Sequence, residues 1–389
     1  MKYSKSQLGK APIEPDRVIP FELGYRPWLD GFRGLSILAV MAFNGHLSYA
    51  QGGFIGVDLF FVLSGFLITS LLVQEYYRTS TISVRSFYYR RALRLLPALF
   101  ALLLCYSAYA ALFQPREKAI AEWKGVFYTL FYAANWAQIG FKAGALGTLS
   151  HAWSLSVEEQ FYILWPLILI VLLKVGKKSL IVAVLVLSAV ASLAWTAWLW
   201  SHTPNYLRMY LGSDTRANEL LIGCLTGFLV TWKSFPQSKP IKFCLHVMSA
   251  ISIVAILYAV YAARYYSGFV YNGGFTLISL GAAVIIIDMI VFPSFLLRIF
   301  EIKPLVWIGK ISYGLYLWHL PIFEVWRQTF EGRVSPFVFT ALRLGSVLLV
   351  AATSYYVLEI PFLKLRRRYN QASADETKLR SQLIAIEGV

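Results

Sequence analysis

Four ionisable side chains stand in two apolar segments near the N-terminus, at Asp30, Arg33, His46 and Asp58. A charged group at membrane depth costs about 2.5 kcal/mol or more, so it persists mainly where it faces a protein interior or a wet cavity. An imidazole takes up a proton near neutral pH and can act as a general base, which a neutral amide cannot do. We therefore interpret residues 29–69 as the core of a functional site.

Helical geometry predicts which of these side chains face the same way. Arg33 and Asn44 are eleven residues apart, which at roughly 100° per residue places them on one face together with Asp30. His46 lies about 220° around an unbroken helix from Arg33, unless Gly45 ends or kinks the helix there. From spacing alone, a polar site inside the bundle and polar groups placed at the two membrane surfaces are equal alternatives.

Three glycines, Gly52, Gly53 and Gly56, precede Asp58 in the connection between the two apolar segments. Glycine allows the backbone to turn sharply and to lie very close to another segment. The pattern predicts a tight loop of this kind, with ordinary turn chemistry as the alternative.

A second polar cluster opens the apolar segment at residues 150–166. His151, Ser154 and Glu158 have spacings of three, four and seven, so they line one side of a helix, whereas Glu159 points about 100° away. As an anion near a helix start, Glu158 could simply interact with the helix dipole. Two adjacent carboxylates with a histidine at membrane depth favour the functional interpretation.

Arginine residues gather in residues 87–99, where Arg91 and Arg94 are three apart on one helical face and Arg90 is adjacent. Guanidinium groups bind phosphate well, so these residues could hold a phosphorylated donor such as a coenzyme A or nucleotide group. The alternative is anchoring to anionic lipid, which charge alone favours.

Two further candidates occur later in the chain. Asp214, Arg216 and Glu219 come together at the start of an apolar segment, where Arg216 and Glu219 could neutralise each other as a structural i, i+3 pair. His319 lies in an apolar segment just before Pro321. It could act directly in chemistry, or it could bond a backbone carbonyl that the proline leaves unpaired.

The overall composition is that of a polytopic membrane protein. Apolar residues make up 58% of the 389 residues and charged residues only 14%. The net charge of +16 could suggest nucleic acid, but the basic residues concentrate in short loops between apolar segments, so we expect no nucleic-acid partner. The three cysteines have no spacing typical of a metal site or a disulfide framework.

Apolar runs of about 17 to 23 residues predict an all-α protein with about ten membrane spans. The spans are expected near residues 30–49, 54–74, 95–113, 154–174, 180–200, 216–232, 243–263, 271–291, 305–327 and 337–359. The segment 123–139 is short and aromatic, which is typical of an interfacial or re-entrant helix. Lys and Arg residues in alternate connections predict that both termini are cytoplasmic.

We expect a single membrane domain at residues 29–360, between a cytoplasmic N-terminal tail at 1–28 and a basic cytoplasmic C-terminal tail at 361–389. No connection between the predicted spans is long enough for a second folded domain of typical size. The whole chemistry is therefore expected inside the helical bundle.

Seven stretches, in order along the chain, resemble the acyltransferase 3 family of integral membrane acyltransferases. They are LDGFRGLSILAV, GGFIGVDLFFVLSGFLIT, FYYRRALRLLPALF, HAWSLSVEEQFYILWP, SDTRANELLIG, GKISYGLYLWHLPIF and SYYVLEIPFLKLRRR. The resemblance covers essentially residues 25–368. It implies transfer of an acyl group, usually acetyl, from cytoplasmic acyl-CoA to a glycan or glycolipid outside.

The resemblance also implies roles for residues of the first span. The family's motif there is an arginine followed eleven positions later by a catalytic histidine. Arg33 matches the arginine, but Asn44 stands where the histidine is expected. His46 is then a displaced candidate for the base, and His151 and His319 are the alternatives.

Other polar positions of the family correspond to residues already singled out: the arginine pair Arg91 and Arg94, and the helix start Ser154, Ser156 and Glu158. We expect Arg33 to stabilise the oxyanion of the thioester, and Asp58 and Glu158 to position the reacting groups. Roles in shaping the site or holding substrate are expected for His151, Ser154, Asp214, Arg216 and His319.

The sequence therefore predicts a multi-pass O-acyltransferase of the inner membrane, with acyl-CoA as donor substrate and no permanently bound cofactor or metal. Its expected partners are membrane lipid and a glycan or glycolipid acceptor. The alternative is a transporter or non-catalytic member of the same scaffold, because Asn44 cannot serve as a base.

Overall fold

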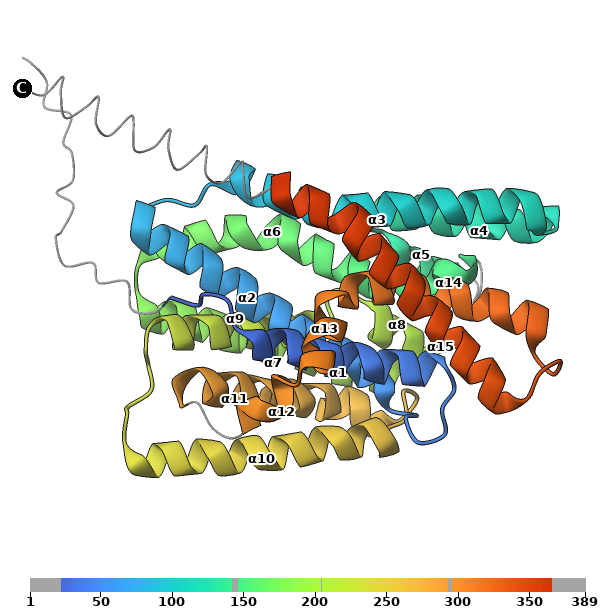
Figure 1. Cartoon of the computed structure of the whole chain (residues 1–389). Helices are drawn as coiled ribbons and strands as arrows, with labels where there is room; N and C mark the ends of the chain where they lie inside the picture. Colours follow the sequence, from blue (N-terminus) through green and yellow to red (C-terminus); the bar gives the residue numbers. More distant parts are fainter. Residues whose placement is uncertain (1–21, 142–145, 204, 293–295, 366–389) are drawn as a thin grey trace, which may run out of the picture.

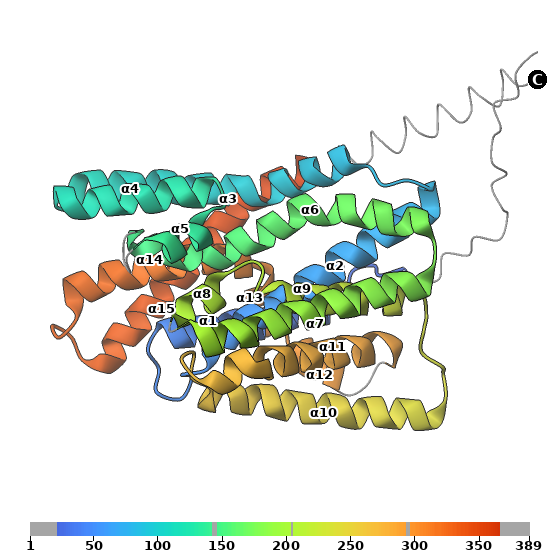
Figure 2. The ribbon, with the colours of Figure 1, turned by 180° about the vertical axis from the view of Figure 1, so that it is seen from behind.

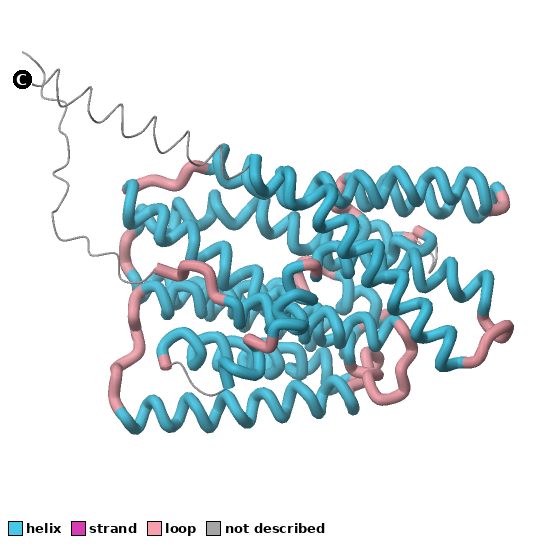
Figure 3. Tube along the Cα trace, in the orientation of Figure 1, coloured by secondary structure: helices cyan, strands magenta, loops and turns pink. Residues whose placement is uncertain are grey.

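The computed structural model describes residues 22–141, 146–203, 205–292 and 296–365, which form a helical bundle without strands (Figure 3). Its α-helices are α1 (Pro27–Asn44), α2 (Gly56–Thr79), α3 (Val84–Phe113), α4 (Arg116–Leu130), α5 (Ala134–Gly140), α6 (Trp153–Val175), α7 (Lys178–His202), α8 (Tyr206–Leu211), α9 (Ala217–Thr231), α10 (Lys239–Ala262), α11 (Phe275–Val291), α12 (Leu296–Phe300), α13 (Lys303–Lys310), α14 (Ser312–Phe330) and α15 (Pro336–Thr353). Short helical turns adjoin them at η1 (Gly53–Ile55), η2 (Gly147–Ala152), η3 (Val270–Gly274) and η4 (Ser354–Glu359). The tails predicted at 1–28 and 361–389 lie largely outside the described residues.

The expected all-α class is confirmed. Within the described residues, seven helical segments are long and apolar enough to cross a membrane. They are Gly53–Thr79, Val84–Phe113, Gly147–Val175, Lys178–His202, Lys239–Ala262, Val270–Val291 and Pro336–Leu365.

Three other predicted spans are helical but do not meet those criteria. The span at 216–232 is α9, an apolar helix of only 15 residues. The span at 305–327 is divided at Ile311 into α13 and α14, and the span at 30–49 is α1, which ends at Asn44. The count of ten spans stays a prediction. The segment 123–139 belongs to α4 and α5, which are too short to cross a bilayer.

The two ends of the bundle carry different connections. The α2–α3, α6–α7 and α9–α10 connections lie together at the left of Figure 1, and we call this the basic end because of neighbouring residues such as Arg85, Lys177 and Lys239. The segment between α1 and η1 and the α14–α15 connection lie toward the opposite end, which we call the far end. Figure 2 shows the same separation from behind. Which end faces the cytoplasm stays a prediction.

The helices differ sharply in how much protein surrounds them. In the most apolar window of α2 and its preceding turn, 78% of the residues are buried, whereas in α10 only 11% are. A helix that is apolar all round and buried belongs to the core, so α2 is central. The exposed apolar faces of α10 are positioned to meet lipid at the edge of the bundle seen in Figure 1.

The glycine loop before α2 makes the close backbone approach expected from its sequence. The Gly52 amide donates a hydrogen bond to the Val260 carbonyl at 2.8 Å. A side-chain carbon at Gly53 would lie 2.1 Å from the Ala39 carbonyl oxygen, so only glycine fits without a shift. The loop thereby fixes the start of α2 against α1 and α10.

Candidate functional site

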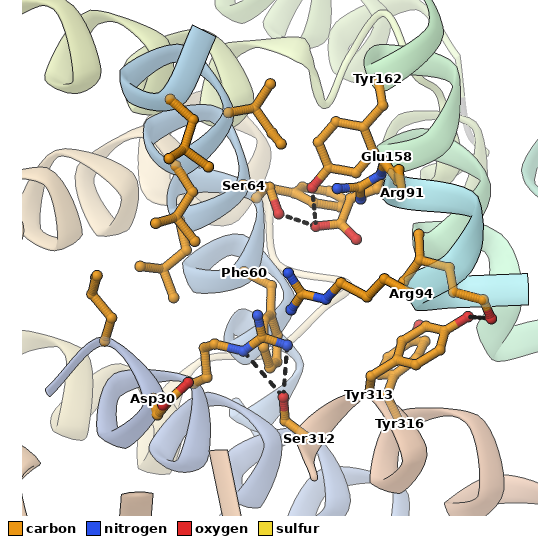
Figure 4. A pocket seen from close by; sticks show the side chains of 18 of the residues that line it. Asp30, Phe60, Ser64, Arg91, Arg94, Glu158, Tyr162, Ser312, Tyr313 and Tyr316 are labelled. Carbon is orange, nitrogen blue, oxygen red and sulfur yellow. Dashed lines mark hydrogen bonds between the residues drawn. The ribbon is translucent and has the colours of Figure 1, made fainter. Parts of the chain in front are cut away.

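A cavity of about 440 Å³ lies among α1, α2, α3, α6 and α14. It follows α2 from Val57 to Leu71, a rise of roughly 21 Å along a helix. Much of its wall is apolar, and Figure 4 shows Phe60 among the labelled side chains that surround it. A long, partly apolar cavity with a few convergent polar groups is the usual form of a small-molecule site.

Arg33 extends from α1 into this cavity and is held by α14. Its Nε and Nη2 atoms donate to the Ser312 hydroxyl at 3.2 and 3.0 Å (Figure 4). The guanidinium also lies 5.9 Å from the Phe60 ring centroid. Arg33 is only half-buried, and its contacts leave further donor hydrogens that can face the cavity.

Glu158 is placed on the cavity wall by α6, as its spacing with Ser154 predicted. Its Oε1 atom accepts hydrogen bonds from the Ser64 hydroxyl of α2 and, at 3.4 Å, from the Tyr162 hydroxyl (Figure 4). Glu158 and Ser154 both line the cavity. These contacts tie α6 to α2 and fix one carboxylate oxygen.

The neighbouring carboxylate of Glu159 points elsewhere, toward Arg91 of α3. The Arg91 Nη2 atom lies 3.0 Å from Glu159 Oε1, and its guanidinium carbon lies 3.1 Å from the Tyr162 ring centroid. Arg91 is therefore held by an ion pair and a cation–π contact while it lines the cavity. The predicted divergence of Glu158 and Glu159 is confirmed.

Arg94 reaches farther into the cavity than the other arginines of α3. Figure 4 shows its side chain between the Ser64–Glu158 contact and Ser312. Arg90, by contrast, lies 3.4 Å from Glu75 and lines neither cavity described here. Its expected role with a donor phosphate is not supported, because α3 turns its side chain away from the cavity.

A second cavity of about 560 Å³ adjoins the first through shared lining residues. Asp30, Arg33 and Arg94 belong to both, and the second adds Lys310 and Glu359. Lys310 is exposed at the end of α13. Three cationic side chains and two carboxylates thus line this second space, and the one excess positive charge suits an anionic group.

Asn44 lies at the other end of α1 from Arg33. Like Arg33, it contacts α14. Its Nδ2 atom is 3.0 Å from Nε2 of His319, which is fully buried in α14. The His151 ring from η2 lies 5.2 Å from the His319 ring, centroid to centroid. The predicted common face of Arg33 and Asn44 is confirmed, since both side chains contact α14.

His46 is not part of this arrangement. Helix α1 does end at Asn44, but Gly45 stays in a right-handed conformation and His46 follows with φ of 57°. The His46 side chain is exposed and lines neither cavity. The end of the helix turns its imidazole toward the surface, so the structure does not support the predicted catalytic role.

Asp58 pairs with Arg216, the residue just before α9, and does not line the cavity. Glu219 lies 3.3 Å from the same guanidinium, and all three side chains are at most 1% exposed. The expected Arg216–Glu219 pair is therefore present with Asp58 added. The predicted role of Asp58 in positioning the reacting groups is not supported, because its carboxylate pairs with Arg216 and joins α2 to the start of α9.

Asp214 lies in the α8–α9 connection, away from both cavities. Its carboxylate accepts a hydrogen bond from Arg208 Nη1 at 2.9 Å and one from Trp195 at 2.8 Å. Burial alone would raise the pKa of Asp214, but these hydrogen bonds outweigh burial and lower it. The residue stabilises a connection, and its expected place in the site is not supported.

Comparison with known proteins connects this geometry to a family. The acyltransferase domain family (acyltransferase 3) matches residues 26–356. This range includes Arg33, Arg94 and Glu158 of the first cavity. The chain belongs to this family. No solved structure matches it.

Curated relatives of the chain are O-acetyltransferases by name. The chain is 35% identical over 369 residues to the peptidoglycan O-acetyltransferase OatA of Listeria monocytogenes, covering 90% of this chain and 57% of the relative. It is also 35% identical over 369 residues to the O-acetyltransferase OatA of Staphylococcus aureus strain MRSA252, covering 92% and 60%. The chain thus spans well under two thirds of the length of the relatives it matches.

Several residues that line the cavities were not predicted from the sequence. They are Ser64, Lys310, Ser312, Tyr316 and Glu359. Serine and tyrosine are common in apolar helices and carry no distinctive signal alone. A signal did exist for Glu359, because it is a carboxylate in an apolar helix, as Asp58 is. For Ser312 and Tyr316 the signal was their i, i+4 spacing, with His319 one turn further on.

Proposed function

We propose that the protein is a membrane O-acyltransferase that moves an acyl group, most simply acetyl, from acyl-CoA to a hydroxyl group of a cell-surface glycan. The observation that carries the proposal is the cavity in which Arg33, Arg94 and Glu158 converge on an apolar space of about 440 Å³. Family membership and the peptidoglycan O-acetyltransferase relatives support the reaction class and a glycan acceptor. We further propose an inner-membrane location with the basic end in the cytoplasm.

The two adjoining cavities suit the two parts of such a donor. The first, along α2, is long and mainly apolar, which fits the thioester arm. The second brings Arg94 and Lys310 together, and these cations would hold the phosphates. Arg33 and Arg94 line both cavities. A single donor molecule that extends through both cavities would therefore contact both arginines.

Arg33 is the residue best placed to act on the thioester carbonyl. The Ser312 hydroxyl holds its guanidinium in a fixed orientation, at 3.2 and 3.0 Å. A preorganised cation stabilises an oxyanion more strongly in a partly buried cavity than in water. Glu158, fixed by Ser64, would accept a hydrogen bond from the amide-rich arm of the donor or from the acceptor.

The experiment that tests this proposal uses the full chain in liposomes with labelled acetyl-CoA and purified peptidoglycan fragments. We expect O-acetyl esters on the glycan, detected by mass spectrometry. Arg94→Gln should raise KM for acetyl-CoA about tenfold or more, because a hydrogen bond to a charged group contributes roughly 1.5–3 kcal/mol. Arg90→Gln is the matched control, since Arg90 lies one turn away on α3 and lines neither cavity.

Two results would contradict the proposal. Equal effects of Arg90→Gln and Arg94→Gln would mean that the cavity does not hold the donor. Movement of lipid or acylated sugar across the liposome membrane without thioester cleavage would favour the transporter interpretation.

Glycans from the producing cell, compared with those of a deletion strain, would show whether an acylated species depends on the gene.

A further inference from the structure

We propose that His319 of α14 is the general base that activates the acceptor hydroxyl, and that Asn44 covers its reactive nitrogen in the resting state. This inference rests on the proposed acyltransferase function. It assigns the base to a helix other than α1, where the family's histidine is expected. The carrying observation is the 3.0 Å contact between Asn44 Nδ2 and His319 Nε2.

The hydrogen bonds of His319 assign its tautomer. Its Nδ1 atom lies 2.7 Å from the Tyr316 carbonyl and 3.1 Å from the Leu315 carbonyl. A carbonyl oxygen only accepts, so Nδ1 must carry the proton in either contact. Nε2 then holds a lone pair, and the Asn44 amide donates to it. A neutral imidazole oriented in this way is ready to take a proton at Nε2.

His319 lines neither cavity itself, but its position on α14 places it close to the first one. Ser312, Tyr316 and His319 are spaced at i, i+4 and i+7, so they form one stripe of the helix. Ser312 holds Arg33 and Tyr316 lines the cavity, while His319 lies one turn beyond, about 5 Å farther toward the far end. Ser312, which holds the oxyanion-stabilising Arg33, therefore lies on the same stripe of α14 as the proposed base, His319.

Asn44 completes the arrangement from α1. It is half-buried, whereas His319 is fully buried, so Asn44 is the more accessible member of the pair. An amide cannot take up the proton itself. Rotation of the Asn44 side chain would uncover Nε2 and leave space for an acceptor hydroxyl in its place. This makes Asn44 a positioning residue.

The other four histidines of the chain fit this role less well. His46 is exposed, and His202 is exposed on α7 and stacked on Trp198. His246 pairs with Asp288 at 2.7 Å between α10 and α11. His151 is close to His319, but its Nε2 points to the Leu317 carbonyl at 3.3 Å, and none of its hydrogen bonds involves α1.

The proposed step balances as follows. The acceptor hydroxyl gives its proton to His319 Nε2 while its oxygen attacks the thioester carbonyl carbon, forming a C–O bond and an oxyanion beside Arg33. Collapse of this intermediate re-forms the carbonyl and breaks the C–S bond. The proton on Nε2 then passes to the departing thiolate. The products are an O-acyl ester and free CoA thiol, and His319 is neutral again.

The test compares acetyl transfer and acetyl-CoA binding for the full chain in liposomes, with peptidoglycan fragments as acceptor. His319→Gln should lower kcat at least a hundredfold, because a general base contributes about 10²–10⁴ in rate, while Kd for acetyl-CoA changes less than threefold. His246→Gln is the matched control and should keep the wild-type rate. In Asn44→His/His319→Gln, which swaps the imidazole and the amide, we expect at least a tenfold recovery of kcat.

Each result bears on a separate part of the argument. A wild-type chain that neither binds acetyl-CoA nor transfers acetyl overturns the proposed function itself. Wild-type transfer that His319→Gln retains overturns only the assignment of the base. If His319→Gln does not fold, the swapped variant decides, since it keeps one imidazole and one amide across the α1–α14 contact. A folded swapped variant with less than a thousandth of the wild-type kcat would overturn the assignment.

Discussion

Removing the guanidinium of Arg216 should be among the most destabilising single changes in the bundle. Arg216 is 1% exposed, and its two partners, Asp58 and Glu219, are fully buried. Arg216→Met keeps the side chain long and apolar but leaves two carboxylates without their cation. Loss of one partner from a buried ion pair costs about 3–5 kcal/mol. At about 1.4 kcal/mol per factor of ten, the ratio of folded to unfolded protein falls about a hundredfold to several thousandfold.

The assay is denaturant unfolding in detergent micelles, followed by the fluorescence of the chain's 12 tryptophans. Trp153 lies 5.9 Å from the Arg216 guanidinium, so its emission should respond directly. The matched control is Arg327→Gln, which breaks an ion pair whose arginine is 54% exposed. An exposed pair contributes about 0–1 kcal/mol, so this variant should stay close to wild type.

A second variant separates charge imbalance from lost packing. Asp58→Val, Arg216→Met and Glu219→Leu together replace all three charged side chains with apolar ones of comparable size. Replacing a whole buried charge cluster is often neutral, so this triple variant should recover most of the lost stability. Equal stability of Arg216→Met and Arg327→Gln would refute the reasoning. So would a triple variant that is no more stable than Arg216→Met.

Three further predictions concern other parts of the chain. Lys310→Gln should raise KM for acetyl-CoA a few-fold. It should leave KM unchanged for acetyl-pantetheine, which lacks the nucleotide phosphates. Equal increases in KM for the two donors would contradict a phosphate contact. Gly309→Ala should lower Tm, because the added Cβ would lie 1.7 Å from the Asp30 carbonyl oxygen and would push α13 away from α1. An unchanged Tm would contradict this close packing of the two helices. Asp214→Asn should lower Tm slightly at pH 7. The folded state depresses the pKa of Asp214, so its stabilisation is present above the unfolded pKa near 3.9 and is lost as pH falls through the lower folded pKa. A difference in Tm that does not shrink as pH falls below about 3.9 would contradict this.

The sequence predicted the local geometry of the site well because a helix has a fixed period. The spacing of Arg33 and Asn44 placed both on one face, and the structure has both contacting α14. The same reasoning separated Glu158, on the cavity wall, from Glu159, which pairs with Arg91. In each case the conclusion needed only the angle per residue within a single helix.

Partners far apart in the chain could not be predicted in the same way. A polar group in an apolar helix indicates a protein interior, but it does not distinguish a cavity from an ion pair. Asp58 and Arg33 gave the same signal, yet Asp58 is sealed against Arg216 and Arg33 faces the cavity. His46 was misplaced for a local reason, since the conformation of the residue after a helix end decides where its side chain points.

The proposed chemistry has one level in the bundle at which donor and acceptor can meet. On the α14 wall, the cavity reaches Tyr316, whose hydroxyl lies 2.5 Å from the Ser154 hydroxyl. His319 lies one turn beyond, on the side away from Arg33. An acyl carbon brought along α2 from the basic end therefore approaches Tyr316 from one side, and a hydroxyl bound at His319 approaches it from the other. Tyr316 thus marks the level of α14 at which the two substrates would meet.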